Sequence, residues 1–161
     1  MNNKLLLLLL TLLSITCKCY AFSGGAPELV CDDMMPIHLV PPQRSKLPYI
    51  VGANNTEIKG GEAVQIEIGG GRFKGLMMEV RKGNRATGKF LLDEDENDFK
   101  TINCHGGKNN VLSHQNNANK KNKTVIWKSP KNPGKYTIYV TIAKDGFVFW
   151  SKIPAEEITV V

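Results

Sequence analysis

Short runs in which apolar and polar residues alternate make up most of the chain after Pro48. The clearest run is Glu62–Ile68, where every second residue from Val64 to Ile68 is apolar and the residues between them are polar. Lys135–Ala143 alternates in the same way over a longer stretch. A period of two is typical of a β-strand that buries one face, because successive side chains point to opposite sides of a sheet.

Several segments combine such runs with flanking turn residues. We predict strands over 49–53, 62–68, 73–81, 89–92, 99–104, 110–114, 124–128, 135–143, 147–153 and 158–161. No segment shows the 3.6-residue periodicity and capping residues of an amphipathic helix. Many short strands with closely spaced turn signals are typical of an antiparallel β-sandwich, here an all-β domain of about eight or nine strands.

Two stretches do not fit the strand pattern. The segment 22–48 contains Pro27, Pro36, Pro41, Pro42 and Pro48, which exclude a regular helix over most of it. We therefore expect an extended, irregular lead-in to the domain. The segment 105–123 is rich in Asn and Lys, and we expect a mobile loop there with at most one short strand.

The first 21 residues have the three-part layout of a secretory signal peptide. A short start containing Lys4 precedes the apolar run 5–15, and Cys19 and Ala21 stand at the −3 and −1 positions of a cleavage site. The apolar run is shorter than the ~20 residues that span a bilayer. A lipoprotein box at Cys17 and an uncleaved anchor are the alternatives to a signal peptide over 1–21. We expect a secreted, extracellular protein without a transmembrane segment.

Length and composition fit one domain over residues 22–161. The chain has 161 residues, 42% of them hydrophobic, which is too many for a wholly disordered chain. Cleavage after Ala21 removes Lys4 and Lys18, so the formal charge falls from +6 to +4. This charge is too low for a histone-like polycation, and no nucleic-acid-binding module is recognisable.

Secretion changes the meaning of the cysteines. Cys31 and Cys104 remain after cleavage, and an even pair in an oxidising compartment predicts one disulfide. Two free thiols or an intermolecular bridge are the alternatives. Asn54 and Asn122 begin the sequons N-N-T and N-K-T, so both are candidate N-glycosylation sites.

Few residues suggest catalysis or metal binding. His38, His105 and His114 are not at zinc-ligand spacing with one another or with a cysteine. The acidic run 93–98 begins like a calcium loop but lacks the glycine and the glutamate that such a loop requires, so we expect a solvated loop, with a weak cation site as the alternative. No nucleophile, zincin or phosphate-loop motif is present, and we expect neither an enzyme nor a cofactor.

A basic segment is the most suggestive chemical feature. Six lysines occur within 16 residues that contain no acidic residue, and a second, looser basic set extends from Arg72 to Lys89. Exposed cationic loops attract polyanions such as lipopolysaccharide phosphates and sulfated glycans; the alternative is a solvated loop that only keeps the protein soluble. The candidate polyanion-binding residues are Lys120, Lys121, Lys123, Lys128, Lys131 and Lys135.

Several motifs together resemble the reeler domain. The opening reads SGGAPE, then VCDDM, and is followed by GGEAVQIEI and FKGLMMEVR. Later landmarks are Cys104, the pair Ser113-His114, Trp127 and the pair Phe149-Trp150. The chain is similar to the single-domain secreted reeler proteins of insects, which include defence proteins of the nodulation-mediating type, and the resemblance covers nearly all of residues 24–160.

The resemblance implies an immunoglobulin-like antiparallel β-sandwich with Cys31 bonded to Cys104. It also implies a role in innate immunity, in which the protein binds microbial surface components in an antibacterial, nodulation or recognition role. A matrix or adhesion module that binds sulfated glycans or a protein partner is the alternative, and a secreted storage protein without a specific ligand is a third hypothesis. Fold by itself does not determine which of these functions is correct.

Overall fold

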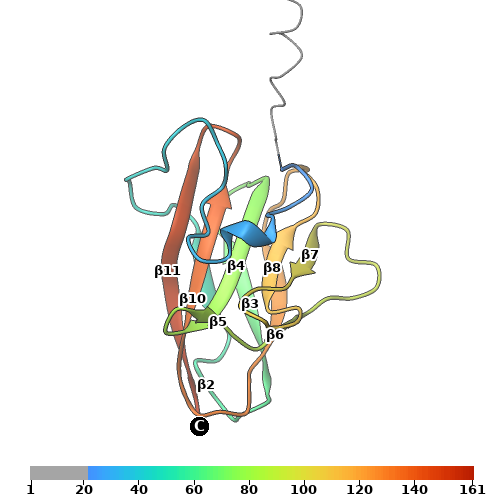
Figure 1. The fold of residues 1–161 in the computed structure, drawn as a ribbon, viewed down its shortest axis with the longest axis vertical. Coiled ribbons are helices and arrows are strands. Elements are labelled where there is room, and N and C mark those ends of the chain that lie inside the picture. The colour runs from blue at the N-terminus through green and yellow to red at the C-terminus, as the bar shows by residue number, and fades with distance from the viewer. Residues whose placement is uncertain (1–21) are drawn as a thin grey trace, which may run out of the picture.

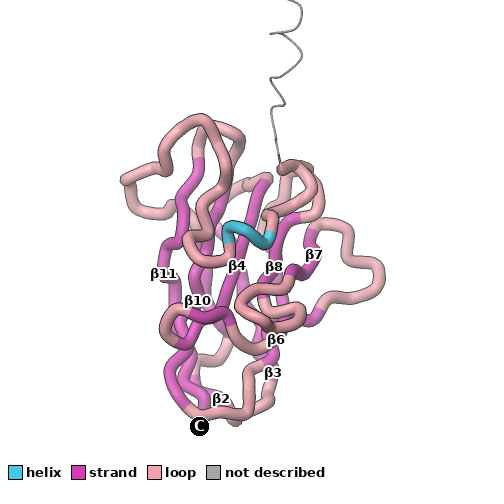
Figure 2. Tube along the Cα trace, in the orientation of Figure 1, coloured by secondary structure: helices cyan, strands magenta, loops and turns pink. Residues whose placement is uncertain are grey.

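The computed structural model describes residues 22–161, which form two β-sheets packed face to face (Figures 1 and 2). The smaller sheet has the order β1-β3-β9-β6. Its strands are β1 (Ile50–Ala53), β3 (Ala63–Gly69), β9 (Lys123–Lys128) and β6 (Lys89–Leu91). All of its strand pairs are antiparallel.

The larger sheet has the order β2-β11-β10-β4-β8-β7, and β5 pairs with β4 beside this path. Its pairs are antiparallel except for β2 with β11. The strands are β2 (Glu57–Ile58), β4 (Gly75–Lys82), β5 (Arg85–Ala86), β7 (Phe99–Ile102), β8 (Val111–His114), β10 (Gly134–Ala143) and β11 (Phe149–Val160). The two sheets confirm the predicted all-β sandwich.

The main core lies between the sheets and is built by alternate residues of each strand. Val64, Ile66 and Ile68 of β3 face the apolar side chains of β4 and β10, and all of them are buried. Trp127 of β9 is fully buried, and its indole N–H donates to Thr87 O at 3.0 Å. Each such large apolar side chain contributes roughly 1.5–3 kcal/mol when it is removed from water, which explains why the alternation predicts the fold.

The strand predictions fail mainly at the C-terminal end. The segments 147–153 and 158–161 belong to one strand, β11, which continues through Pro154. Proline lacks the N–H that a central strand needs, but it is tolerated at a sheet edge. At Pro154 only β10 pairs with β11, since the β2 pairing is confined to Thr159 and Val160. The two-residue strands β2 and β5 are too short to leave a recognisable pattern.

The lead-in packs against the outer face of the larger sheet. It contains one 3₁₀ turn, η1 (Glu28–Val30), which crosses in front of β4 and β8 in Figure 1. Val30 and Met34 form a second buried cluster with Met77 of β4 and Val111 of β8. Since β4 is covered on both faces, seven of its eight residues are buried.

The predicted signal peptide over 1–21, with Cys17 and Cys19, lies outside the described residues. Within 22–161, no helix has the length and hydropathy that crossing a bilayer requires. The segment 105–123 contains β8, which agrees with the single short strand expected there.

Candidate functional site

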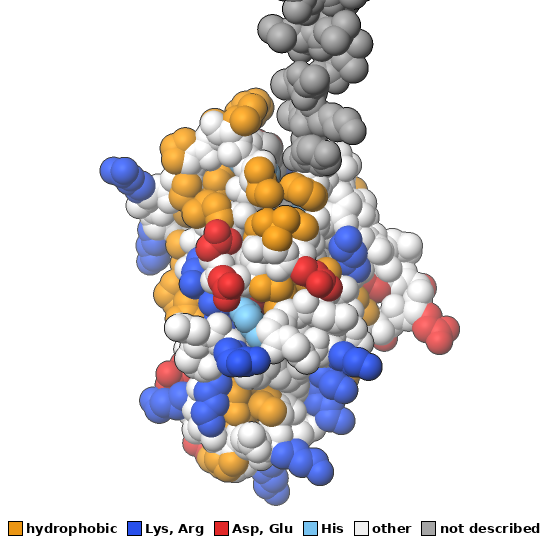
Figure 3. Space-filling model, viewed as in Figure 1, with side chains coloured by type: hydrophobic (Ala, Val, Ile, Leu, Met, Phe, Trp, Pro, Cys, Tyr) orange, Lys and Arg blue, Asp and Glu red, His pale blue; other side chains and the backbone are white. Residues whose placement is uncertain are grey.

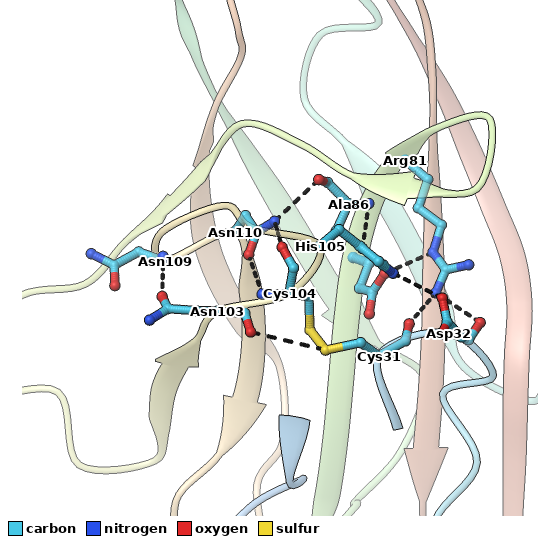
Figure 4. The surroundings of a disulfide bond; sticks show 10 residues. Cys31, Asp32, Arg81, Ala86, Asn103, Cys104, His105, Asn109 and Asn110 are labelled. Carbon is cyan, nitrogen blue, oxygen red and sulfur yellow. Dashed lines mark hydrogen bonds and ion pairs between the residues drawn. A yellow bond between two sulfur atoms is a disulfide. The ribbon is translucent and has the colours of Figure 1, made fainter. Parts of the chain in front are cut away.

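Cys31 and Cys104 form a disulfide with a Cα–Cα distance of 5.7 Å, which joins the lead-in to the loop after β7 (Figure 4). Asn110 holds this loop in place through side-chain hydrogen bonds. Its Oδ1 accepts from Cys104 N at 2.9 Å, and its Nδ2 donates to Cys104 O and Ala86 O. The predicted disulfide is confirmed. This disulfide anchors the lead-in against the outer face of the larger sheet.

Lys120 is not part of an exposed cationic loop, which corrects the sequence-based prediction for this residue. The backbone of Lys120 bridges to Phe73, and the residue is only 1% exposed. The ammonium donates to Lys74 O, Asn116 O, Asn116 Oδ1 and Ala118 O at 2.9–3.2 Å. These acceptors satisfy all three ammonium donors, so Lys120 holds the loop together and is closed to an external anion.

The acidic run 93–98 folds against this same loop. Asp98 forms an ion pair with Lys123 and lies 4.0 Å from the ammonium of Lys120. The hydrogen bond from Lys123 holds the pKa of Asp98 below its ordinary value. Gln115 donates to Glu96 O at 2.8 Å, which fixes the two loops side by side. The structure therefore neutralises part of the basic segment, although no acidic residue is near it in the sequence.

The other four candidate lysines are exposed but lie in different places. Lys121 is in the loop before β9, and Lys128 is at the end of β9 on the outer face of the smaller sheet. Lys131 lies beside Gly60 in the turn between β9 and β10, and Lys135 forms an ion pair with Glu157 at 2.8 Å. The six lysines therefore do not form one continuous patch.

Lys128 has a neighbour that the sequence did not indicate. The register of β6 with β9 places Lys89 directly opposite Lys128, and Ala63 lies on the other side of Lys128. Both lysines are exposed. Like charges directly opposite each other destabilise a sheet, so this pair is a candidate anion site that strand order creates.

The three histidines are separated as well. His38 packs edge-on against Phe149 with ring centroids 4.9 Å apart, and His105 lies 3.1 Å from Asp32. His114 contacts Leu76 O and Phe22 O. Among residues 22–161, no group of three or more His, Cys, Asp or Glu side chains could hold a metal ion.

Both sequon asparagines are exposed. Asn54 follows β1, and its Oδ1 accepts from Gln65 N at 3.1 Å. Asn122 precedes β9 in a left-handed conformation with φ of 49°. Glycosylation of Asn54 and Asn122 stays a prediction.

Comparison with known proteins decides the family. The family model described as "Reeler domain" matches residues 29–161. The chain belongs to the reeler domain family.

Relatives and solved structures agree with this reeler assignment. "Putative defense protein Hdd11" from Hyphantria cunea is 32% identical, over 87% of this chain and 89% of its own length. "Defense protein l(2)34Fc" from Drosophila melanogaster is 30% identical, over 81% and 84%. The crystal structure of the human F-spondin reeler domain matches with a TM-score of 0.62 at 11% identity, over 75% of this chain and 94% of that one. At this identity, the F-spondin likeness shows the fold alone.

Proposed function

We propose that this reeler protein is a secreted defence protein that binds polyanionic components of microbial surfaces, such as lipopolysaccharide phosphates. The names of the insect relatives support the defence role. The layout of residues 1–21 supports secretion. The names of the family and of these defence relatives are non-enzymatic in kind, and we propose no catalysis.

The facing pair Lys89 and Lys128 is the observation that carries the polyanion proposal. The two ammonium groups emerge from adjacent strands of an exposed face, with an alanine as the next neighbour of Lys128. An anion bound between them would relieve their mutual repulsion, and neither residue forms an ion pair among residues 22–161. Lys121 and Lys131 would add long-range attraction.

The test measures binding of the purified, secreted protein to whole bacteria, lipopolysaccharide and heparin across a salt series. The double variant Lys89→Glu/Lys128→Glu is compared with Lys46→Glu/Lys144→Glu, which makes the same change in net charge on exposed loops. We expect salt-sensitive binding to bacteria and lipopolysaccharide that the first variant loses and the second retains.

Three results would count against the proposal. Equal loss in both variants would mean that only net charge matters and that the lysine pair is not a site. Heparin retention without microbial selectivity would favour the matrix and adhesion alternative. Absence of binding to all three materials would overturn the polyanion proposal and leave the defence role supported only by the relatives' names.

A further inference from the structure

A second feature, separate from the lysine pair, is a cavity of about 470 Å³ at one end of the larger sheet. Its floor is the outer face of β4 and β10, at Gly75, Met77, Thr141 and Ala143. Its walls are the lead-in and the turn between β10 and β11. The volume falls within the roughly 300–1,000 Å³ of small-molecule sites.

Two small residues open this cavity. Gly75 and Ala143 face each other across β4 and β10, so no side chain larger than a methyl group rises from this part of the floor. A Cβ added at Gly75 would lie 3.1 Å from the Ala143 methyl group and 3.6 Å from the His114 ring. Over Met77, by contrast, Val30 and Met34 pack closely against the sheet. A larger side chain at Gly75 or Ala143 would therefore reduce the space between the floor and the lead-in.

The lining is mainly apolar and continues onto the surface. At the mouth Leu39 is 95% exposed, Phe147 72% and Ile37 52%. Figure 3 shows hydrophobic side chains gathered at this end of the molecule. Contiguous exposed apolar side chains mark interaction sites. Protein interiors normally pack densely, so an apolar space of this size beside such side chains is available to a ligand.

The polar side chains in the interior of the cavity are uncharged at pH 7. The Thr141 hydroxyl already donates to Met34 O at 2.7 Å. Burial lowers the pKa of both His38 and His114, so both rings are neutral at pH 7. His38 Nδ1 is buried and has no hydrogen-bond partner among residues 22–161. This interior therefore suits the uncharged part of a ligand, such as a hydrocarbon chain.

Charged residues of both signs lie at the mouth. Lys74 lines it and is exposed, and Lys144 lies next to Asp145. Asp145, the carboxylate among the described residues that line the cavity, accepts from Phe147 N at 2.8 Å and Val148 N at 2.9 Å, so it caps the turn. An anionic head group fits Lys74, because among residues 22–161 its ammonium forms no hydrogen bond or ion pair and attracts Asp145 only at longer range.

We propose that the cavity binds a single-chain anionic amphiphile, such as a fatty acid, as a monomer, with its hydrocarbon chain between the lead-in and the β4–β10 floor and its head group at Lys74. This site does not depend on the polyanion proposal. Lys89 and Lys128 lie on the smaller sheet, so either site can fail without the other.

The test is displacement of the fluorescent fatty acid cis-parinaric acid from the secreted protein by dodecanoate, with dodecyltrimethylammonium as the cationic comparison. We expect dodecanoate to compete and the cationic amphiphile to compete at least about 10-fold more weakly. Ala143→Phe fills the cavity and should weaken dodecanoate binding at least about 10-fold. Lys74→Glu should weaken it several-fold.

Three further variants keep the test decisive. Phe147→Ala changes an exposed side chain at the mouth, so it should weaken binding without affecting folding, even if Ala143→Phe fails to fold. Leu29→Gln removes an equally exposed apolar residue that does not line the cavity, and Lys89→Glu/Lys128→Glu removes the other site. Both should bind dodecanoate as the unaltered protein does. Unchanged affinity in the cavity variants, equal competition by the cationic amphiphile, or binding to anionic vesicles without uptake of monomer would each overturn the proposal.

Discussion

Glu79 and Arg81 project from the same face of β4 and form a buried ion pair in which Arg81 Nε lies 2.7 Å from Glu79 Oε2. Their side chains are 0% and 2% exposed. The guanidinium also donates to Cys31 O at 2.6 Å and Asp32 O at 3.1 Å (Figure 4). The pair therefore ties the lead-in to the sheet beside the disulfide, on a face that would otherwise be exposed to solvent.

Removing Arg81 should destabilise the fold strongly. Arg81→Ala leaves a buried carboxylate without its cation and Cys31 O without its guanidinium donor, whereas Asp32 O keeps a hydrogen bond from Lys152 Nζ. Loss of one partner of a buried pair costs about 3–5 kcal/mol. Urea denaturation of the purified protein measures the change in the free energy of unfolding. Arg72→Ala, at an exposed arginine, should stay within about 0.5 kcal/mol of the original. Equal effects of the two changes would show that the buried pair has no special role.

Loss of the disulfide should also lower stability. The bridge spans a sequence separation of 73, for which chain entropy predicts roughly 4.4 kcal/mol, within a usual range of about 2–5 kcal/mol. The double change Cys31→Ser/Cys104→Ser avoids a free thiol, and thermal unfolding with and without reductant measures the effect. Reductant should lower the melting temperature of the original protein to that of the variant. A melting temperature that neither treatment changes would contradict a structural role for this bridge.

Lys120 should matter for folding and not for ligand binding. Lys120→Met keeps the side-chain length but leaves Asn116 O and Ala118 O, which are partly buried by these contacts, without the ammonium donor, which costs about 1–3 kcal/mol. Lys121→Met, at the exposed neighbouring lysine, should change stability by less than about 0.5 kcal/mol. Chemical denaturation of both variants checks this contrast. If Lys120→Met were as stable as the original, the buried ammonium would have no structural function.

The Asp98–Lys123 pair should make stability depend on acidity. The pKa of Asp98 is lowered in the folded protein, so its contribution is complete above the ordinary value of 3.8 and is lost as pH falls through the lower folded value. Asp98→Asn should cost up to about 1 kcal/mol at pH 7, because the pair is partly exposed. The difference should disappear in strong acid. Urea titrations at several pH values test this, with exposed Asp95→Asn as the variant that should show no such change.

Alternation predicts a strand most directly where the strand buries one face and exposes the other, although the run 73–81 predicted β4 without meeting this condition. The strand β3 meets this condition, and its buried and exposed residues alternate along its length. The strand β4 does not, since the lead-in covers its outer face and buries Glu79 and Arg81, which alternation alone would expose to solvent. β11 was divided in the prediction at a proline that only its edge position permits.

The candidate site likewise depends on contacts that the local sequence does not show. Charge density along the chain identified the lysines, but spacing in sequence does not determine which side chains become neighbours. Lys120 and Lys123 meet Asp98 because two loops fold together, and Lys128 meets Lys89 because β9 pairs with β6. The cavity over Gly75 and Ala143 likewise exists only because β4 and β10 are adjacent and the lead-in crosses above them.

By itself, the sequence determined the all-β class, the cysteine pair and the reeler resemblance, because periodicity and residue identity are local properties of the chain. The tertiary structure decided which lysines face solvent, where a buried ion pair lies and where the cavity opens. These depend on strand order and on what covers each face, and they come from contacts between residues far apart in the sequence.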